Sequence, residues 1–89
     1  GHGLVMQALV SRAAARRQLG ELDAAAVDAG RAVALARSAA DPETLIAAQV
    51  ETARIALRRG DRATARRAVD AAVADIARLP AGAANPENR

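Results

Sequence analysis

The stretch GDRATARRAVDAA, residues 60–72, decides the fold of this chain. Gly60 ends one helical segment, because glycine readily takes the left-handed conformation that follows a helix. Asp61 is a good N-cap for the next helix. Ala65 and Ala72 then lie on one face of that helix and leave room for a close neighbour. The stretch therefore predicts a tight turn between two closely packed helices.

The same arrangement occurs forty positions earlier, in the stretch GELDAAAVDAGRA, residues 20–32. Gly20 corresponds to Gly60, and farther upstream Val10 corresponds to Val50. Two helix–turn–helix units follow, and neither buries its apolar face alone, so the units should stack. The sequence thus predicts an all-α fold of two stacked antiparallel helical hairpins.

Four helices are expected from the residues that end and begin helices along the chain. The third has the clearest start, since Asp41 suits an N-cap and Pro42 the first helical position. We expect repeat one at about residues 4–38, repeat two at about 41–79, a tag remnant or disordered start at 1–3 and a flexible tail at 80–89.

Apolar residues at spacings of three and four predict which faces are buried. The stripe expected for the third helix consists of Ile46, Val50, Ala53 and Leu57, flanked by Leu45, Gln49 and Ala56. The stripe expected for the fourth consists of Ala65, Ala68, Val69, Ala72, Val73, Ile76 and Leu79.

Composition excludes several classes of site. The chain has 89 residues, no Cys, no aromatic residue and a formal net charge of +3, and all its basic residues are Arg. The chain has no Cys, Lys or Tyr and a single terminal His, so most catalytic arrangements of a nucleophile and a general base are excluded. We expect no enzyme activity, cofactor or metal. No apolar run is long enough to cross a bilayer, so we expect a cytoplasmic protein without a membrane partner.

The turn Gly60-Asp61, followed by Ala65 and Ala72, resembles the second half of the tetratricopeptide repeat. Residues 20–32 repeat that spacing, and the resemblance covers roughly residues 4–79. The period of forty differs from the usual 34 of the family. This longer, Ala- and Arg-rich variety is similar to repeats in large bacterial signal-responsive transcription regulators. The resemblance implies protein binding, in a regulatory or signalling context.

In this family the first helix of each repeat lines a concave ligand groove. That resemblance implies a groove on the first and third helices, formed by Leu9, Arg12, Arg16, Gln49, Thr52 and Ala56. The family's carboxylate-clamp residues have no convincing counterparts here. The expected partner is a protein or peptide, and an acidic one fits the Arg residues.

Arginines also gather around the turn at Gly60, in a basic patch formed by Arg58, Arg59, Arg62 and Arg66. Such a patch could hold a phosphate or an acidic peptide through guanidinium contacts. It could equally offset helix dipoles and keep an Ala-rich surface soluble. Nucleic-acid binding is disfavoured, because aromatic stacking residues are absent.

Three functions remain open. The first is a non-catalytic protein-interaction module, part of a larger bacterial regulatory or signalling protein. The second is a self-associating element that forms a homodimer through Leu4, Val5, Met6 and Leu9. The third is a weak nucleic-acid or phosphate-binding regulatory domain that uses the Arg clusters.

Overall fold

The computed structural model describes residues 2–80, and these form four helices joined by short turns. The helices are α1 His2–Gln18, α2 Leu22–Ser38, α3 Pro42–Arg58 and α4 Arg62–Ala77. Residues 2–80 contain no strand, so the all-α prediction is confirmed. Helix α1 begins at His2, two residues before the expected start at Leu4. Gly1 and the expected tail from residue 81 onward lie outside the described residues.

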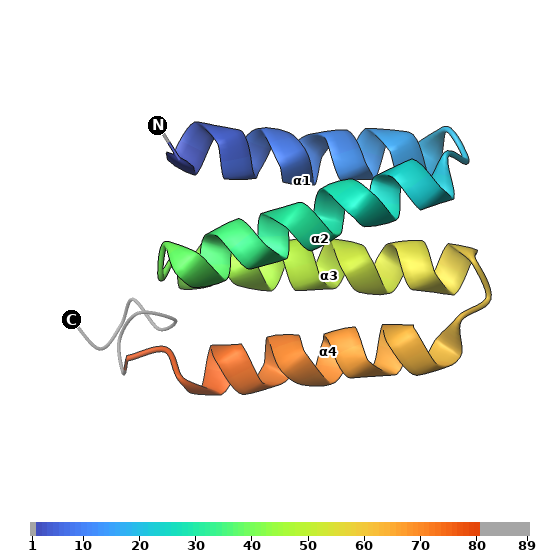
Figure 1. Ribbon diagram of the computed structural model, residues 1–89. Helices are drawn as coiled ribbons and strands as arrows, with labels where there is room; N and C mark the ends of the chain where they lie inside the picture. Colours follow the sequence, from blue (N-terminus) through green and yellow to red (C-terminus); the bar gives the residue numbers. More distant parts are fainter. Residues whose placement is uncertain (1, 81–89) are drawn as a thin grey trace, which may run out of the picture.

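The helices form two antiparallel hairpins that stack on each other (Figure 1). Helix α1 packs on α2, and α3 packs on α4. Helix α3 also packs on α2 and, over a smaller contact, on α1. Within residues 2–80, the backbones of α2 and α4 do not approach each other closely. Helix α3 therefore contacts all three other helices and forms the centre of the molecule.

All three turns have the same backbone geometry. In each, the N–H of the residue after the turn donates to a carbonyl oxygen of the last helical turn: Glu21 to Arg16 at 2.8 Å, Asp41 to Ala36 at 2.9 Å and Asp61 to Ala56 at 2.9 Å. This is the hydrogen bond of the Schellman motif, whose central residue needs a positive φ. Gly20 and Gly60 have φ of 82° and 76°, whereas Ala40 has φ of 52°. The first and last of these turns were expected from their glycines and the middle one from Asp41 and Pro42, although no residue type indicated the positive φ of Ala40.

Helices α3 and α4 begin with the same side-chain cap. The carboxylate of Asp41 accepts from the N–H of Thr44 at 3.2 Å and from its hydroxyl at 2.7 Å. Asp61 accepts from the same groups of Thr64 at 3.1 Å and 2.6 Å. These bonds lower the pKa of both aspartates. The acid-x-x-Thr cap thus fixes where both helices of repeat two begin.

Alanine makes up most of the core. The alanines with no exposed surface are Ala13, Ala25, Ala29, Ala32, Ala36 and Ala48. Ile55, at 2% exposure, packs with Ala13, Ala25 and Ala29 at one end of the molecule. Met6 and Leu45 pack with Ala36 at the other end. Small residues let the helix backbones approach, and a few larger side chains fill the remaining space.

The predicted stripes of α3 and α4 are partly wrong. On α3, Leu57 is 61% exposed and Val50 37% exposed, while Leu45 and Ile55 are buried. The reason is that α3 meets helices on several sides, so its buried surface does not follow one stripe. On α4 the alanines are buried as expected, but Val69, Val73 and Ile76 are 49%, 59% and 48% exposed. None of the helices described is both long and apolar enough to cross a membrane.

Candidate functional site

Asp28 joins α1 to α2 through two arginines. The carboxylate is 1% exposed. It accepts from Nε and Nη2 of Arg12 at 2.9 Å and 2.8 Å, and from Nη1 of Arg16 at 2.9 Å. The hydrogen bonds from Arg12 lower the pKa of Asp28, with further help from Arg16 and against the opposing effect of burial. Arg12 and Arg16 therefore hold the first hairpin together.

A second buried carboxylate ties the two hairpins to each other. Glu51 of α3 is 3% exposed, and its carboxylate accepts from Nε of Arg17 on α1. Arg54 lies 4.0 Å away on the other side. Arg58 of α3 also donates to the backbone carbonyl of Arg17, at 3.1 Å. These contacts fix the first and third helices in their relative positions.

The six residues predicted to line one groove do not share one. Leu9 is buried in the core with Ala32 and Ala48. Arg12 and Arg16 bind Asp28 on α2, as described above. The other three, Gln49, Thr52 and Ala56, line hollows between α2 and α4. Leu9 packs on both α2 and α3, so the six residues do not share one side of the molecule.

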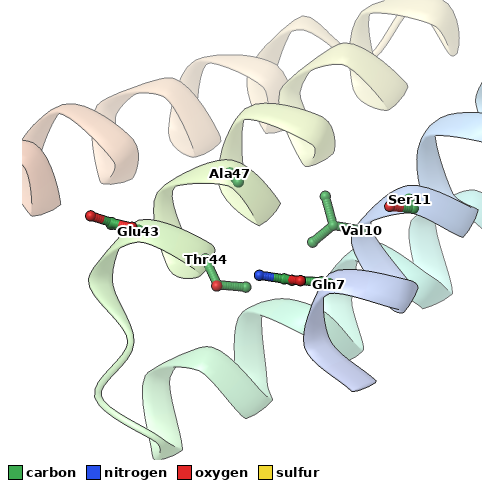
Figure 2. Close-up of a pocket in the computed structure, with 6 residues that line it drawn as sticks. All are labelled: Gln7, Val10, Ser11, Glu43, Thr44 and Ala47. Carbon is green, nitrogen blue, oxygen red and sulfur yellow. The ribbon is translucent and has the colours of Figure 1, made fainter. Parts of the chain in front are cut away.

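The facing sides of α1 and α3 enclose a different hollow (Figure 2). We call it the inner hollow; its volume is about 380 Å³, and it is lined by Gln7, Val10, Ser11, Glu43, Thr44 and Ala47. The hydroxyl of Thr44 is already used in the cap with Asp41. The other lining residues belong to exposed or half-exposed positions, with no buried polar group among them. The inner hollow is thus shallow and offers little to fix a ligand.

A longer depression runs along α3 between α2 and α4, and we call it the outer groove. Its central part has a volume of about 270 Å³. Gln49 and Thr52 come from α3, and the walls are formed by Val33 and Arg37 of α2 and by Thr64 and Arg67 of α4. Thr52 and Thr64 also line a smaller hollow toward the α3–α4 turn, and Arg37 lines another toward the α2–α3 turn. The groove exists because α2 and α4 both pack on α3, while their backbones do not approach each other closely.

Gln49 is the most unusual residue of the outer groove. Its side chain is 4% exposed, and Oε1 has no hydrogen-bond partner among the described residues. A buried polar atom without a partner is costly, and native proteins contain few of them. Next to it, the Thr52 hydroxyl donates to the carbonyl of Ala48 at 2.8 Å, which leaves its oxygen able to accept. This part of the groove is therefore rich in acceptors that lack donors.

Two arginines flank these acceptors. Neither Arg37 nor Arg67 forms an ion pair with a carboxylate in residues 2–80, although Arg67 donates to the Thr64 hydroxyl at 3.0 Å. Both are exposed. The outer groove thus combines two arginines without an ion pair at its edges with hydrogen-bond acceptors at its base, although the charge of Arg67 also acts on Asp61. Sequence reasoning named Gln49 and Thr52 but missed Arg37 and Arg67, which come from helices of different repeats.

The predicted basic patch is only partly available. Arg59 pairs with Asp23 of α2 at 3.2 Å, and Arg66 lies 3.8 Å from Asp70 on its own helix. Arg58 binds the carbonyl of Arg17. Arg62 is exposed at the start of α4. Most of these guanidinium groups therefore already contact an acceptor of the chain. Within residues 2–80 no three acidic or His side chains gather where they could hold a metal ion.

Comparison with known proteins adds no relative. No protein-family model matches this chain, and no curated protein or solved structure matches it either.

Proposed function

We propose that this chain is a non-catalytic protein-interaction module that binds an acidic, extended segment of a partner protein along the outer groove. The observation that carries the proposal is the buried amide of Gln49, whose Oε1 has no partner, between Arg37 and Arg67, which form no ion pair in residues 2–80. Such an amide needs a donor, and the arginines favour carboxylates.

An extended segment supplies both kinds of group. Its backbone N–H groups are free to donate to Thr52 and, once the buried amide of Gln49 turns toward the groove, to Oε1, as in the recognition of extended peptides by main-chain hydrogen bonds. A helix is a poorer match, because most of its N–H groups are already bonded within the helix. Acidic side chains of the segment would reach Arg37 on one wall and Arg67 on the other. The partner is therefore defined by two properties, an extended backbone and negative charge.

The resemblance to tetratricopeptide repeats supports protein binding, but not the place of the groove, because in that family the groove lies on the first helices. Repeats of this kind act by binding proteins, and the Ala- and Arg-rich variety with a period of forty resembles repeats of large bacterial regulators. We accordingly propose that the module serves in a cytoplasmic regulatory or signalling protein of bacteria. The outer groove lies on the α2–α4 side, away from the α1–α3 side where the inner hollow is found.

A direct test is an NMR titration of the isotope-labelled chain with a short peptide of alternating Glu and Ser. We expect saturable shifts at the amides of Gln49, Thr52 and Thr64, and none with the same peptide carrying Gln in place of Glu. The double variant R37E/R67E should weaken binding by at least about tenfold, which corresponds to about 1.4 kcal/mol of binding free energy. This is less than the free energy that two charge-assisted hydrogen bonds contribute.

The matched control is R31E/R62E. It makes the same change of charge on α2 and α4, at exposed positions that do not line the central outer groove. It should bind nearly as well as the unchanged chain. Equal losses in both double variants would indicate a general effect of charge and contradict the proposal. Tighter binding to duplex DNA than to the acidic peptide, with a steep salt dependence, would favour the nucleic-acid alternative instead.

A further inference from the structure

The side of α2 that packs on α3 is repeated on α4, where nothing covers it. Ala29 and Ala36 of α2 have no exposed surface, and Val33 is partly buried. Forty residues later α4 carries Val69, Ile76 and Val73 at the same positions, all between 48% and 59% exposed. We call these three residues the α4 end face. It is larger and more apolar than the face of α2 that α3 covers.

The opposite end of the molecule shows the complementary feature. Leu45, Ala48 and Ile55 of α3 are buried in the clusters shared with α2. The residues forty positions earlier are Val5, Ala8 and Ala15 of α1, and all three are exposed, Val5 at 51%. We call these three the α1 end face. Each end of the stack therefore carries one half of the contact that joins the two hairpins inside it.

We propose that the α4 end face of one copy of this chain packs on the α1 end face of a second copy, in the arrangement that α2 and α3 have within one chain. The contact joins two different faces. An assembly of any length therefore still has one free α1 end face and one free α4 end face at its ends, and it does not close. This self-association goes beyond the peptide binding proposed above and uses different residues.

The sizes of the residues on the two end faces compensate each other. Inside the chain, Ala29 packs with the large Ile55. The corresponding pair between copies is the larger Val69 with the small Ala15.

Likewise the pair Ala36 and Leu45 within the chain becomes Ile76 and Val5 between copies. The first exchange removes one side-chain carbon and the second adds two, so total side-chain volume is nearly kept over the two pairs together, although not at each position.

The homodimer contact expected from the sequence is revised by the same observations. Of the four residues named for it, Met6 and Leu9 are 3% and 6% exposed and belong to the core of one chain. Leu4 and Val5 are 73% and 51% exposed, and of the two only Val5 belongs to the α1 end face. The proposed contact therefore uses the exposed start of α1 together with α4, and not the same face from both copies.

Several charges near the end faces are paired within each copy, although Arg31, which lines a hollow with Val5 and Ala8, has no ion pair in residues 2–80. Arg66, beside Val69 on α4, lies 3.8 Å from Asp70. Arg12 and Arg16 of α1 share the carboxylate of Asp28. Apolar burial therefore drives the association, which should persist at high salt.

Two single variants test the proposal. Their mass is measured by sedimentation at concentrations up to about 1 mM, so that even weak association is detected. Val5→Glu blocks the α1 end face and Val73→Glu blocks the α4 end face; both residues are exposed, so both variants should fold. The unchanged chain should form species that grow with concentration. Each variant alone should remain at the mass of one 9.1 kDa chain.

A mixture of the two variants separates this arrangement from others. The V5E chain keeps its α4 end face and the V73E chain keeps its α1 end face, so the mixture should reach twice the mass of one chain and no more. Val27→Glu, at a 62% exposed position of α2 outside both faces, should associate like the unchanged chain. A monomeric unchanged chain, a monomeric mixture, or undiminished association of either single variant overturns the proposal.

Discussion

Arg12 donates two hydrogen bonds to the buried carboxylate of Asp28, and the corresponding positions forty residues later hold Thr52 and Ala68. Arg16 completes the ion-paired group, and its counterpart is Ala56. The two hairpins thus differ in the residues that fill the same positions between their helices. The first buries a charge with its partners, and the second uses small residues without charge.

This difference predicts the effects of exchanging the two sets of residues. The double variant R12T/R16A leaves the Asp28 carboxylate buried without its partners, so it should be strongly destabilised. Adding D28A gives the first hairpin the residues of the second and should recover most of the lost stability. Urea unfolding followed by circular dichroism measures both effects. A triple variant less stable than the double variant would contradict this interpretation of Asp28.

Stability should fall in acid because of the same carboxylate. The hydrogen bonds from Arg12 put the pKa of Asp28 below its value in the unfolded chain, which is about 3.9. The unfolded state therefore binds protons first as the pH falls, and the free energy of unfolding decreases. Asp41 and Asp61, whose pKa values are lowered by Thr44 and Thr64, act in the same direction.

We expect urea midpoints that are nearly constant above about pH 5 and decrease progressively below about pH 4. The triple variant R12T/R16A/D28A should show a shallower decrease, because it lacks one of the three aspartates. An identical slope in the two proteins would show that Asp28 does not contribute.

The two large aliphatic residues near the end of α3 should differ in importance. Ile55 is 2% exposed and Leu57 is 61% exposed. Ile55→Ala leaves a cavity among Ala13, Ala25 and Ala29, so it should cost about 2–5 kcal/mol of unfolding free energy. Leu57→Ala should change that free energy by less than about 0.5 kcal/mol. Similar losses in both variants would contradict the orientation of α3.

The orientation of α3 is also where sequence reasoning failed. The helix ends were predictable because their causes are local: Gly20 and Gly60 take a positive φ, and Asp41 and Asp61 cap the helices that follow. The buried side of α3 depends on three neighbouring helices, which no local pattern encodes. Helix α4 packs on α3 through its alanines, because small side chains let the two helices approach closely. The larger Val69 and Val73 therefore lie on the exposed side of α4.

In the candidate site, too, features with a local cause were predicted and features that depend on several helices were not. Gln49 and Thr52 were identified because they lie on the first helix of repeat two. Arg37 and Arg67 were not, since they lie on helices of different repeats that meet only across α3. Asp28 was expected only as one of several local partners of the arginines, although its position carries a stronger signal. It is three residues from Ala25 and four from Ala32, and an acidic residue within a buried stripe implies a basic partner.

The middle turn predicts a stabilising substitution. Ala40 has φ of 52° in a turn whose counterparts use glycine. Ala40→Gly should relieve left-handed strain of about 1 kcal/mol and raise the urea midpoint. Gly60→Ala should lower it by a similar amount, through strain alone, since nothing lies within 4 Å of an added Cβ. Shifts of the same sign in both variants would show that the turns are not equivalent.

The stacking of two hairpins in one register, with α3 against α2, is tested most directly by methyl-to-methyl nuclear Overhauser effects in the isolated chain under conditions where it is monomeric. We predict cross-peaks between Ala29 and Ile55 and between Ala36 and Leu45, because these pairs share core clusters. Cross-peaks from α2 to Val50 or Leu57, with none to Ile55, would contradict the register on which the account rests.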